Sequence, residues 1–163
     1  MPIMQIAVIG ASSCSPEEYE AARTVGYLIA GNRETLVCGG LSGVMEGACR
    51  GAKEMDGTTL GIIPGTAGEN PYVDVVVRTG MSHARNALVV GSADAVIAIG
   101  GGYGTLSEIG LALKMKKAVF GVGTWEIDGI FRCATPEEAV LMAVRASRLS
   151  RPSGSPPSPR ESH

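Results

Sequence analysis

The feature that most constrains the fold of this chain is a regular alternation between two kinds of segment. Apolar runs of strand length lie at residues 5–9, 35–38, 58–63, 73–77, 95–99 and 118–122, and stretches with helical spacing lie at residues 17–30, 44–55, 82–92, 106–115 and 136–147. Strands that are apolar throughout, with helices between them, are typical of a parallel sheet covered on both faces. The alternation therefore predicts a doubly wound α/β fold with a mainly parallel sheet.

Two helix starts are marked by their local sequence. Ser15-Pro16-Glu17-Glu18 and Thr135-Pro136-Glu137-Glu138 each place a hydroxyl at the N-cap, a proline at the first helical position and an acid three residues after the cap. The length of the chain favours a single domain, which we expect over residues 1–149. Residues 150–163 are rich in serine and proline, and we expect a disordered tail there.

Composition and charge exclude several classes of function. The formal net charge is −2 and no basic run exceeds Lys116-Lys117, so we expect neither nucleic-acid nor membrane binding. No apolar run is long enough to span a bilayer. The four cysteines form no Cys-x-x-Cys pair and the N-terminus lacks a signal-peptide pattern, which predicts a cytoplasmic protein. His83 and His163 are the only histidines, so we expect no protein-built metal site.

Two glycine-rich junctions between a strand and a helix suggest an anion-binding site. One contains Gly100-Gly101-Gly102 and Gly104, and the other spans residues 39–43. Glycine allows a ligand to approach the backbone closely, and the free N–H groups of the following helix turn bind anions. Because the carboxyl ends of parallel strands share one edge of a sheet, both junctions are expected there. They predict binding of a phosphorylated small molecule, and the alternative is that the glycines serve only tight turns and close packing.

The loops at this edge supply the candidate ligand-binding residues. They are Gly10, Ser12, Ser13, Gly39, Gly40, Ser42, Gly43, Asn86, Gly100, Gly101, Gly102, Tyr103, Gly104 and Thr105. Tyr103 is expected either to stack on a flat ring or to shield the loop. Neither glycine cluster matches G-x-x-x-x-G-K-[ST], and the first strand is not followed by G-x-G-x-x-G. A P-loop nucleotide hydrolase is therefore excluded, and a dehydrogenase is not favoured.

Arg85 and Glu108 are the candidate catalytic residues. Glu108 is expected in the first turn of its helix, where the segment 105–108 also matches a capping box, so a capping role is an equal alternative. An anion bound to the amides of residues 102–105 would occupy the donors that a cap uses and leave Glu108 facing a sugar. Arg85 is expected to reach the same edge, the alternative being a solvated side chain. His83 is more often a surface or packing residue, and we leave it out of the catalytic set.

The segments Gly39-Gly40-Leu41-Ser42-Gly43-Val44-Met45-Glu46 and Gly101-Gly102-Tyr103-Gly104-Thr105-Leu106-Ser107-Glu108, together with Arg85, resemble the signature of the Lonely Guy superfamily, once labelled "possible lysine decarboxylase". The resemblance spans about residues 3–147 and implies a Rossmann-like fold. Enzymes of that superfamily are phosphoribohydrolases that cut the N-glycosidic bond of cytokinin or adenosine monophosphates. In its loops the chain is more similar to a branch that includes the molybdenum cofactor carrier proteins.

The chain departs from the enzyme pattern at two positions, and these positions distinguish a hydrolase from a carrier protein. The enzymes typically have proline where this chain has Gly100, and an Arg-Lys pair where it has Arg85-Asn86. We therefore expect binding of a phosphorylated nucleotide or pterin, with the molybdenum cofactor as possible cargo and no required cofactor. In a carrier, the polar edges of the pterin would meet Ser12, Ser13 or Asn86. The alternative is a nucleoside 5′-monophosphate phosphoribohydrolase, in which Glu108 would act at the ribose and Arg85 would hold the phosphate or the base.

The segment 106–115 is apolar nearly all round, more than packing on one sheet face requires. It predicts that a second subunit covers this helix. We expect a homodimer or a homotetramer, which the resemblance also implies.

Overall fold

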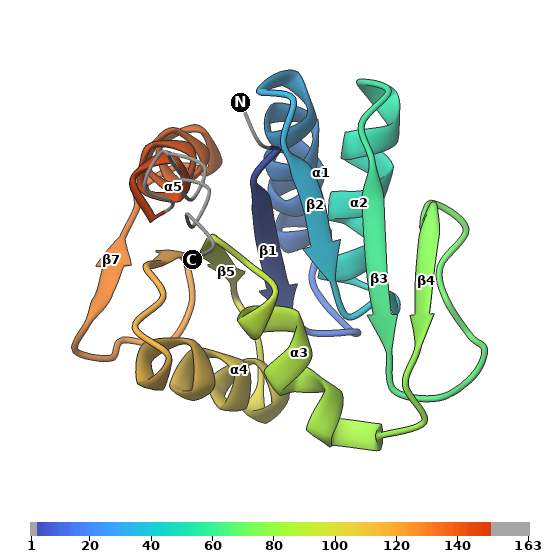
Figure 1. Ribbon diagram of the computed structural model, residues 1–163. Coiled ribbons are helices and arrows are strands. Elements are labelled where there is room, and N and C mark those ends of the chain that lie inside the picture. The colour runs from blue at the N-terminus through green and yellow to red at the C-terminus, as the bar shows by residue number, and fades with distance from the viewer. Residues whose placement is uncertain (1–2, 151–163) are drawn as a thin grey trace, which may run out of the picture.

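The computed structural model of the protein describes residues 3–150, and these residues form a seven-stranded sheet with helices on both faces (Figure 1). The strand order is β4-β3-β2-β1-β5-β6-β7, and every neighbouring pair is parallel. The strands are β1 (Gln5–Gly10), β2 (Thr35–Cys38), β3 (Thr59–Ile63), β4 (Val75–Arg78), β5 (Ala95–Ile99), β6 (Val119–Val122) and β7 (Ile130–Arg132). The predicted doubly wound α/β fold is confirmed.

The helices divide between the two faces of the sheet. One face is covered by α1 (Pro16–Gly31), α2 (Val44–Glu54) and α5 (Pro136–Ser150), and the other by α3 (Asn86–Gly91) and α4 (Tyr103–Lys114). Each face has its own buried cluster of aliphatic side chains. Because α3 and α4 pack near the centre of the sheet, the half formed by β3 and β4 has no α-helix over it on that face, and β3 is contacted there by the 3₁₀ turn η1 (Ser82–Arg85) (Figure 1).

The two expected capping arrangements at α1 and α5 are present. The hydroxyl of Ser15 accepts from the Glu18 amide at 3.1 Å, and the Glu18 carboxylate accepts from the Ser15 amide at 3.2 Å. At α5 the Thr135 hydroxyl accepts from the Glu138 amide at 3.2 Å. Both helices therefore begin where the sequence predicts.

The capping box proposed at residues 105–108 is wrong. Helix α4 begins at Tyr103 with Gly102 as its N-cap, and no side chain caps it. The helix thus starts three residues earlier than predicted, inside the glycine run, and Glu108 lies in its second turn and not its first. Because glycine has no side chain, Gly102 at the N-cap does not mark the start of the helix in the sequence as Ser or Thr would.

Two further elements differ from the prediction. The segment expected as one helix over 82–92 is a 3₁₀ turn, η1 (Ser82–Arg85), followed by the short helix α3. Strand β7 was not predicted, because three residues carry too little pattern to identify a strand. The predicted tail lies outside the described residues apart from Ser150, so the domain boundary stays a prediction. Among the described residues, no helix has the length and hydropathy needed to cross a membrane.

Candidate functional site

A pocket of about 260 Å³ lies at the carboxyl ends of the central strands. Its lining residues are Gly10, Ala11, Ser12, Leu41, Met45, His83, Arg85, Asn86, Gly102, Gly104, Thr105 and Glu108. The sheet order runs outward from β1 on one side and from β5 on the other, so the pocket occupies the point where the order reverses. Open α/β sheets bind their ligands at this place. We call it the Arg85 pocket.

The N-terminus of α4 forms one wall of the Arg85 pocket. The first backbone bond of this helix is donated by the Leu106 amide to the Gly102 carbonyl at 3.0 Å. The amides of Tyr103, Gly104 and Thr105 consequently have no acceptor among the residues that the structure describes. Of these three residues, Gly104 and Thr105 line the Arg85 pocket. Free amides at a helix N-terminus favour a bound anion.

Arg85 places a buried positive charge in the same pocket. The residue is 8% exposed, and its Nη1 donates to the Oδ1 of Asn86. Asn86 in turn donates to the Ser107 hydroxyl at 3.4 Å, which ties the pair to α4. The Nε of Arg85 is buried and has no partner in the described part of the chain. A buried donor without an acceptor is costly, so the Arg85 side chain carries an unsatisfied polar atom at the pocket.

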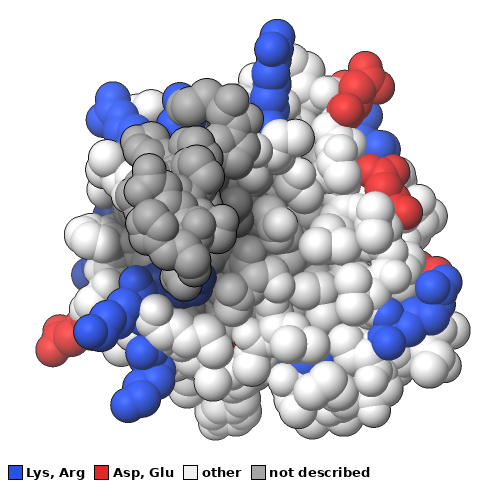
Figure 2. Space-filling model, viewed as in Figure 1, with Lys and Arg blue, Asp and Glu red and all other residues white. Residues whose placement is uncertain are grey.

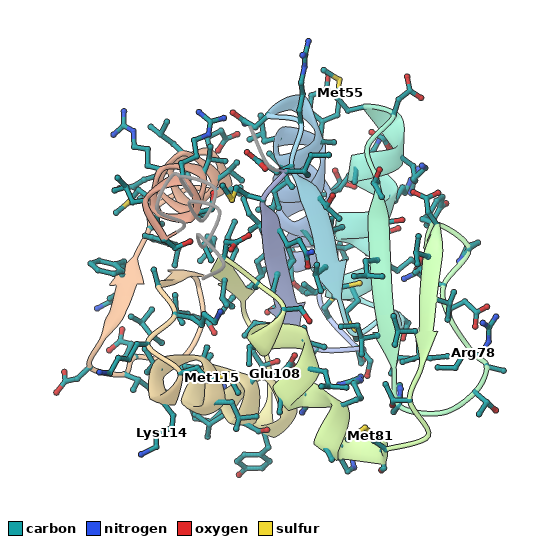
Figure 3. All side chains as sticks on the ribbon, viewed as in Figure 1. Met55, Arg78, Met81, Glu108, Lys114 and Met115 are labelled. Carbon is teal, nitrogen blue, oxygen red and sulfur yellow. The ribbon has the colours of Figure 1, made fainter. Side chains whose placement is uncertain are left out.

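Glu108 supplies a buried carboxyl group that lines the pocket and lies beside α3 (Figure 3). The residue is 7% exposed, and its carboxylate makes no hydrogen bond or ion pair with any described residue. Burial raises the pKa of Glu108 to about 7, and the positive charge of Arg85 acts in the opposite direction. Near neutral pH this carboxyl group can therefore either accept or donate a proton.

The second glycine-rich junction, residues 39–43, supports the pocket from outside. The Ser42 hydroxyl donates to the Ser12 carbonyl at 2.8 Å, and the Val44 amide at the start of α2 donates to the Ala11 carbonyl at 3.0 Å. One amide of α2 is thus used by the protein itself. This junction fixes the loop after β1, and of its residues only Leu41 lines the Arg85 pocket.

The glycines of this junction are explained by close packing. A Cβ on Gly39 would come within 2.8 Å of the Arg85 Nη2 and 2.9 Å of the Met45 sulfur. A Cβ on Gly40, which has a φ of 75°, would come within 2.6 Å of Ile63. At residues 39–43 the glycines therefore serve close packing, which is the alternative given above to anion binding. The unpaired amides lie at the other junction, at the start of α4.

The structure brings together half of the predicted site residues. Gly10, Ser12, Asn86, Gly102, Gly104, Thr105, Arg85 and Glu108 line the Arg85 pocket, whereas Ser13, Gly39, Gly40, Ser42, Gly43, Gly100, Gly101 and Tyr103 do not. The sequence did not indicate Ala11, Leu41 and Met45, whose apolar side chains carry no chemical signal, and His83 was left out of the predicted set. The position of His83, two residues before Arg85, was the signal that could have included it.

Comparisons with known proteins show which proteins share this fold. The structure is similar to the molybdenum cofactor binding protein of the phototrophic bacterium Rippkaea orientalis, at 34% identity over 89% of this chain and 98% of that one, with a TM-score of 0.84. It is also similar to the Moco carrier protein of Chlamydomonas reinhardtii, at 31% identity over 91% and 99% of the two chains and a TM-score of 0.82.

An uncharacterized protein of Archaeoglobus fulgidus is 45% identical over 149 residues, which cover 90% of this chain and 99% of the relative. The predicted resemblance to the superfamily and to its carrier branch is thereby confirmed. A model of the SLOG cluster4 family matches residues 3–149, and the chain belongs to that family.

Proposed function

We propose that the protein is a carrier for a phosphorylated pterin of the molybdenum cofactor class. Two similar proteins are described as binding or carrying this cofactor. The observation that carries the proposal is the unpartnered Nε of the buried Arg85, in a pocket that also holds the open amides of α4. A positive charge and free N–H groups in one pocket suit a phosphate group.

In this proposal the phosphate of the ligand binds the amides of Gly104 and Thr105 and the guanidinium of Arg85. Asn86 is a positioning residue, because its Oδ1 holds the guanidinium in place. A guanidinium so held loses little further conformational freedom when an anion binds. The pocket can thus bind a phosphate without a large rearrangement.

The proposal is tested by purifying the protein from a host that makes the molybdenum cofactor and recording its mass under native conditions. We expect bound cofactor on the wild-type protein and on Arg78→Ala, an exposed arginine at the end of β4 (Figure 3), and none on Arg85→Ala. In calorimetry, inorganic phosphate should bind the wild-type protein and Arg78→Ala with similar affinity and should not bind Arg85→Ala. A wild-type protein that retains no cofactor and binds no phosphate would overturn the proposal.

A phosphoribohydrolase is the second candidate function, and Glu108 is the observation that favours it. A buried carboxyl group with a pKa of about 7 and no partner of its own is suited to general acid or base chemistry at a glycosidic bond. Incubation with AMP and other nucleoside monophosphates, followed by assay of free base and ribose 5-phosphate, separates the two functions. Base release that disappears in Glu108→Gln supports the hydrolase, and retained cofactor without base release supports the carrier.

We also propose that the protein forms a homodimer or a homotetramer. In α4 the exposed positions are mostly polar or small, so this helix supports a second subunit less strongly than its sequence suggested. They are Tyr103, Gly104, Ser107, Gly110 and Lys114. The stronger support is the half of one sheet face, formed by β3 and β4, over which no α-helix lies. Figure 2 shows this face of the molecule as largely uncharged, with most charged side chains at its margin.

A further inference from the structure

A second hollow of about 310 Å³ lies across the glycine loop from the Arg85 pocket. It is lined by Glu18, Gly100, Gly101, Gly123, Thr124 and Trp125, and we call it the Trp125 hollow. Gly102 lines the Arg85 pocket, whereas its neighbours Gly100 and Gly101 line the hollow. The loop is therefore a wall between two adjoining spaces.

This wall is held firmly by side chains from the segment that follows β6. The Thr124 hydroxyl donates to the Gly100 carbonyl at 2.6 Å, and the Trp125 indole N–H donates to the Gly102 carbonyl at 3.1 Å. A Cβ on Gly100 would come within 2.5 Å of the Glu18 carboxylate, so glycine at this position makes room for the Glu18 side chain beside the loop. The hollow is built before any ligand arrives.

Two aromatic rings stand beside the Trp125 hollow. Tyr103 is 84% exposed although it lies between two glycines at the start of α4. Its ring centroid is 6.2 Å from that of Trp125, with an angle of 31° between the planes. Exposed aromatic faces next to a phosphate site are suited to stacking with a flat heterocycle.

The two spaces differ in charge and so prefer different chemical groups. Arg85 and the open amides of α4 give the Arg85 pocket a positive character. Among the described residues that line the Trp125 hollow, the only charged side chain is Glu18, which is negative. A phosphate is disfavoured there, whereas a neutral ring with N–H donors is favoured.

The size of the Arg85 pocket points the same way. Sites that enclose most of a drug-sized ligand have volumes of about 300–1,000 Å³. At about 260 Å³, the Arg85 pocket holds only part of a nucleotide-sized molecule. The rest of the ligand must extend over the rim, and the Trp125 hollow lies directly across that rim.

We infer that the Trp125 hollow is the subsite for the flat ring of the same ligand, and that Glu18 selects a ring with adjacent ring N–H and amino donors. Pterin and guanine both present this donor pair, and adenine does not. The Glu18 carboxylate already accepts from the Ser15 amide through Oε2, which leaves lone pairs on both oxygens for the donor pair. This inference rests on the proposed phosphate site in the Arg85 pocket.

The test uses GMP, AMP and ribose 5-phosphate as probes and Trp125 as the reporter, because it is the only tryptophan in the chain. We expect GMP to quench Trp125 fluorescence and to bind at least about fivefold more tightly than ribose 5-phosphate, since the sugar phosphate lacks the stacking ring. Ribose 5-phosphate should bind by calorimetry without quenching. GMP should also bind more tightly than AMP.

The variant Glu18→Gln isolates the role of the carboxylate, because glutamine still completes a capping box at α1. We expect this variant to lower the preference for GMP over AMP about tenfold, as the loss of charge-assisted hydrogen bonds implies. The matched control Glu17→Gln changes an exposed carboxylate one residue away and should leave the preference unchanged. Tyr103→Ala should weaken GMP binding and not ribose 5-phosphate binding.

The outcomes separate this inference from the proposed function. Ribose 5-phosphate that binds through Arg85, with equal affinity for GMP and no quenching, would overturn the ring subsite and leave the phosphate site intact. An unchanged preference in Glu18→Gln would overturn the role of Glu18. Absence of binding by all three probes would overturn the phosphate site and the ring subsite together.

Discussion

Arg85 and Glu108 line the same pocket, both are more than nine-tenths buried, and yet they form no ion pair among the residues that the structure describes. Arg85 donates instead to Asn86, and the Glu108 carboxylate makes no hydrogen bond with any residue that the structure describes. Ion pairs normally offset part of the cost of burying two charges. Here the two groups remain available to a ligand. Their burial without an ion pair lowers the stability of the protein when no ligand is bound.

The first prediction concerns the pH dependence of stability. The pKa of Glu108 is raised by burial to about 7 in the folded protein, whereas an unfolded glutamate ionises near pH ~4.3. The unfolded state therefore binds fewer protons between these values, so Glu108 makes the free energy of unfolding fall as pH rises from ~4.3 to ~7, by up to about 4 kcal/mol. Below ~4.3 both states are protonated, and above ~7 the loss is complete.

Urea denaturation of wild type and Glu108→Gln, in a buffer free of phosphate, measures this effect. The stability of Glu108→Gln relative to wild type should increase from pH 4 to pH 8. The exposed carboxylate variant Glu17→Gln should show no such trend. A difference between wild type and Glu108→Gln that does not change with pH contradicts the prediction.

The second prediction concerns Asn86, which is 4% exposed and accepts from the Arg85 guanidinium. In Asn86→Leu the guanidinium loses this acceptor while it remains buried, so the free energy of unfolding should fall by roughly 1–3 kcal/mol. The control Ser107→Ala removes the hydroxyl that accepts from Asn86 at 3.4 Å and is exposed, so its loss should be smaller, within ~0.5 kcal/mol. Equal losses in the two variants would show that Asn86 does not position Arg85 through this bond.

Much of this architecture could be predicted from the sequence because its signals are local. Apolar strands with β-branched residues and capping boxes at α1 and α5 depend on neighbouring residues, and these elements formed where expected. The edge at which the site would lie followed from the parallel sheet. The grouping of Arg85, Glu108 and the start of α4 in one pocket agrees with that prediction.

One of the predictions that differed depends on contacts between distant segments. The role of residues 39–43 is set by the carbonyls of Ala11 and Ser12, which lie about thirty residues away and take up donors from this junction. No periodicity or motif in either segment reports that contact. The wrong capping box at residues 105–108 has a local origin, because the true N-cap, Gly102, has no side chain that marks the start of α4.

The third prediction contrasts two glycines near α4. Gly100 has a φ of 52°, a backbone conformation that disfavours other residues, and a Cβ there would meet the Glu18 carboxylate. Gly100→Ala should lower the free energy of unfolding by roughly 1–2 kcal/mol or more. Gly110 lies inside α4 with nothing within 4 Å of an added Cβ, so Gly110→Ala should raise it by about 0.5–1 kcal/mol.

Thermal denaturation of the two variants in parallel measures this contrast, and a shift of the same sign in both would contradict it. The φ of Gly100 also bears on the family pattern, in which the enzymes typically have proline at this position. Proline holds φ near −65°, so this loop cannot accept proline without a change of backbone. The departure at Gly100 is therefore a different loop conformation and not a neutral replacement.

The last prediction concerns the uncovered face of the sheet. Val75 and Val77 on the edge strand β4 are exposed, and they lie in register with Leu60 and Ile62 of β3 on the same face. A second copy of this chain fits such a face because two uncharged surfaces can meet without burying an unpaired charge. Val77→Lys would place a charge in that contact and should convert the oligomer to a monomer, as measured by light scattering after size-exclusion chromatography.

The matched control is Leu141→Lys, which adds the same charge at an exposed leucine of α5 on the opposite face of the sheet and should leave the oligomer intact. Because Val77 is exposed in the single chain, Val77→Lys should barely change the unfolding of the monomer, so loss of assembly would not reflect loss of fold. A wild-type protein that is monomeric at micromolar concentration contradicts the assembly itself. If the oligomer persists in Val77→Lys but is lost in Leu141→Lys, the subunit interface lies at α5 and not at the β3–β4 half of the sheet.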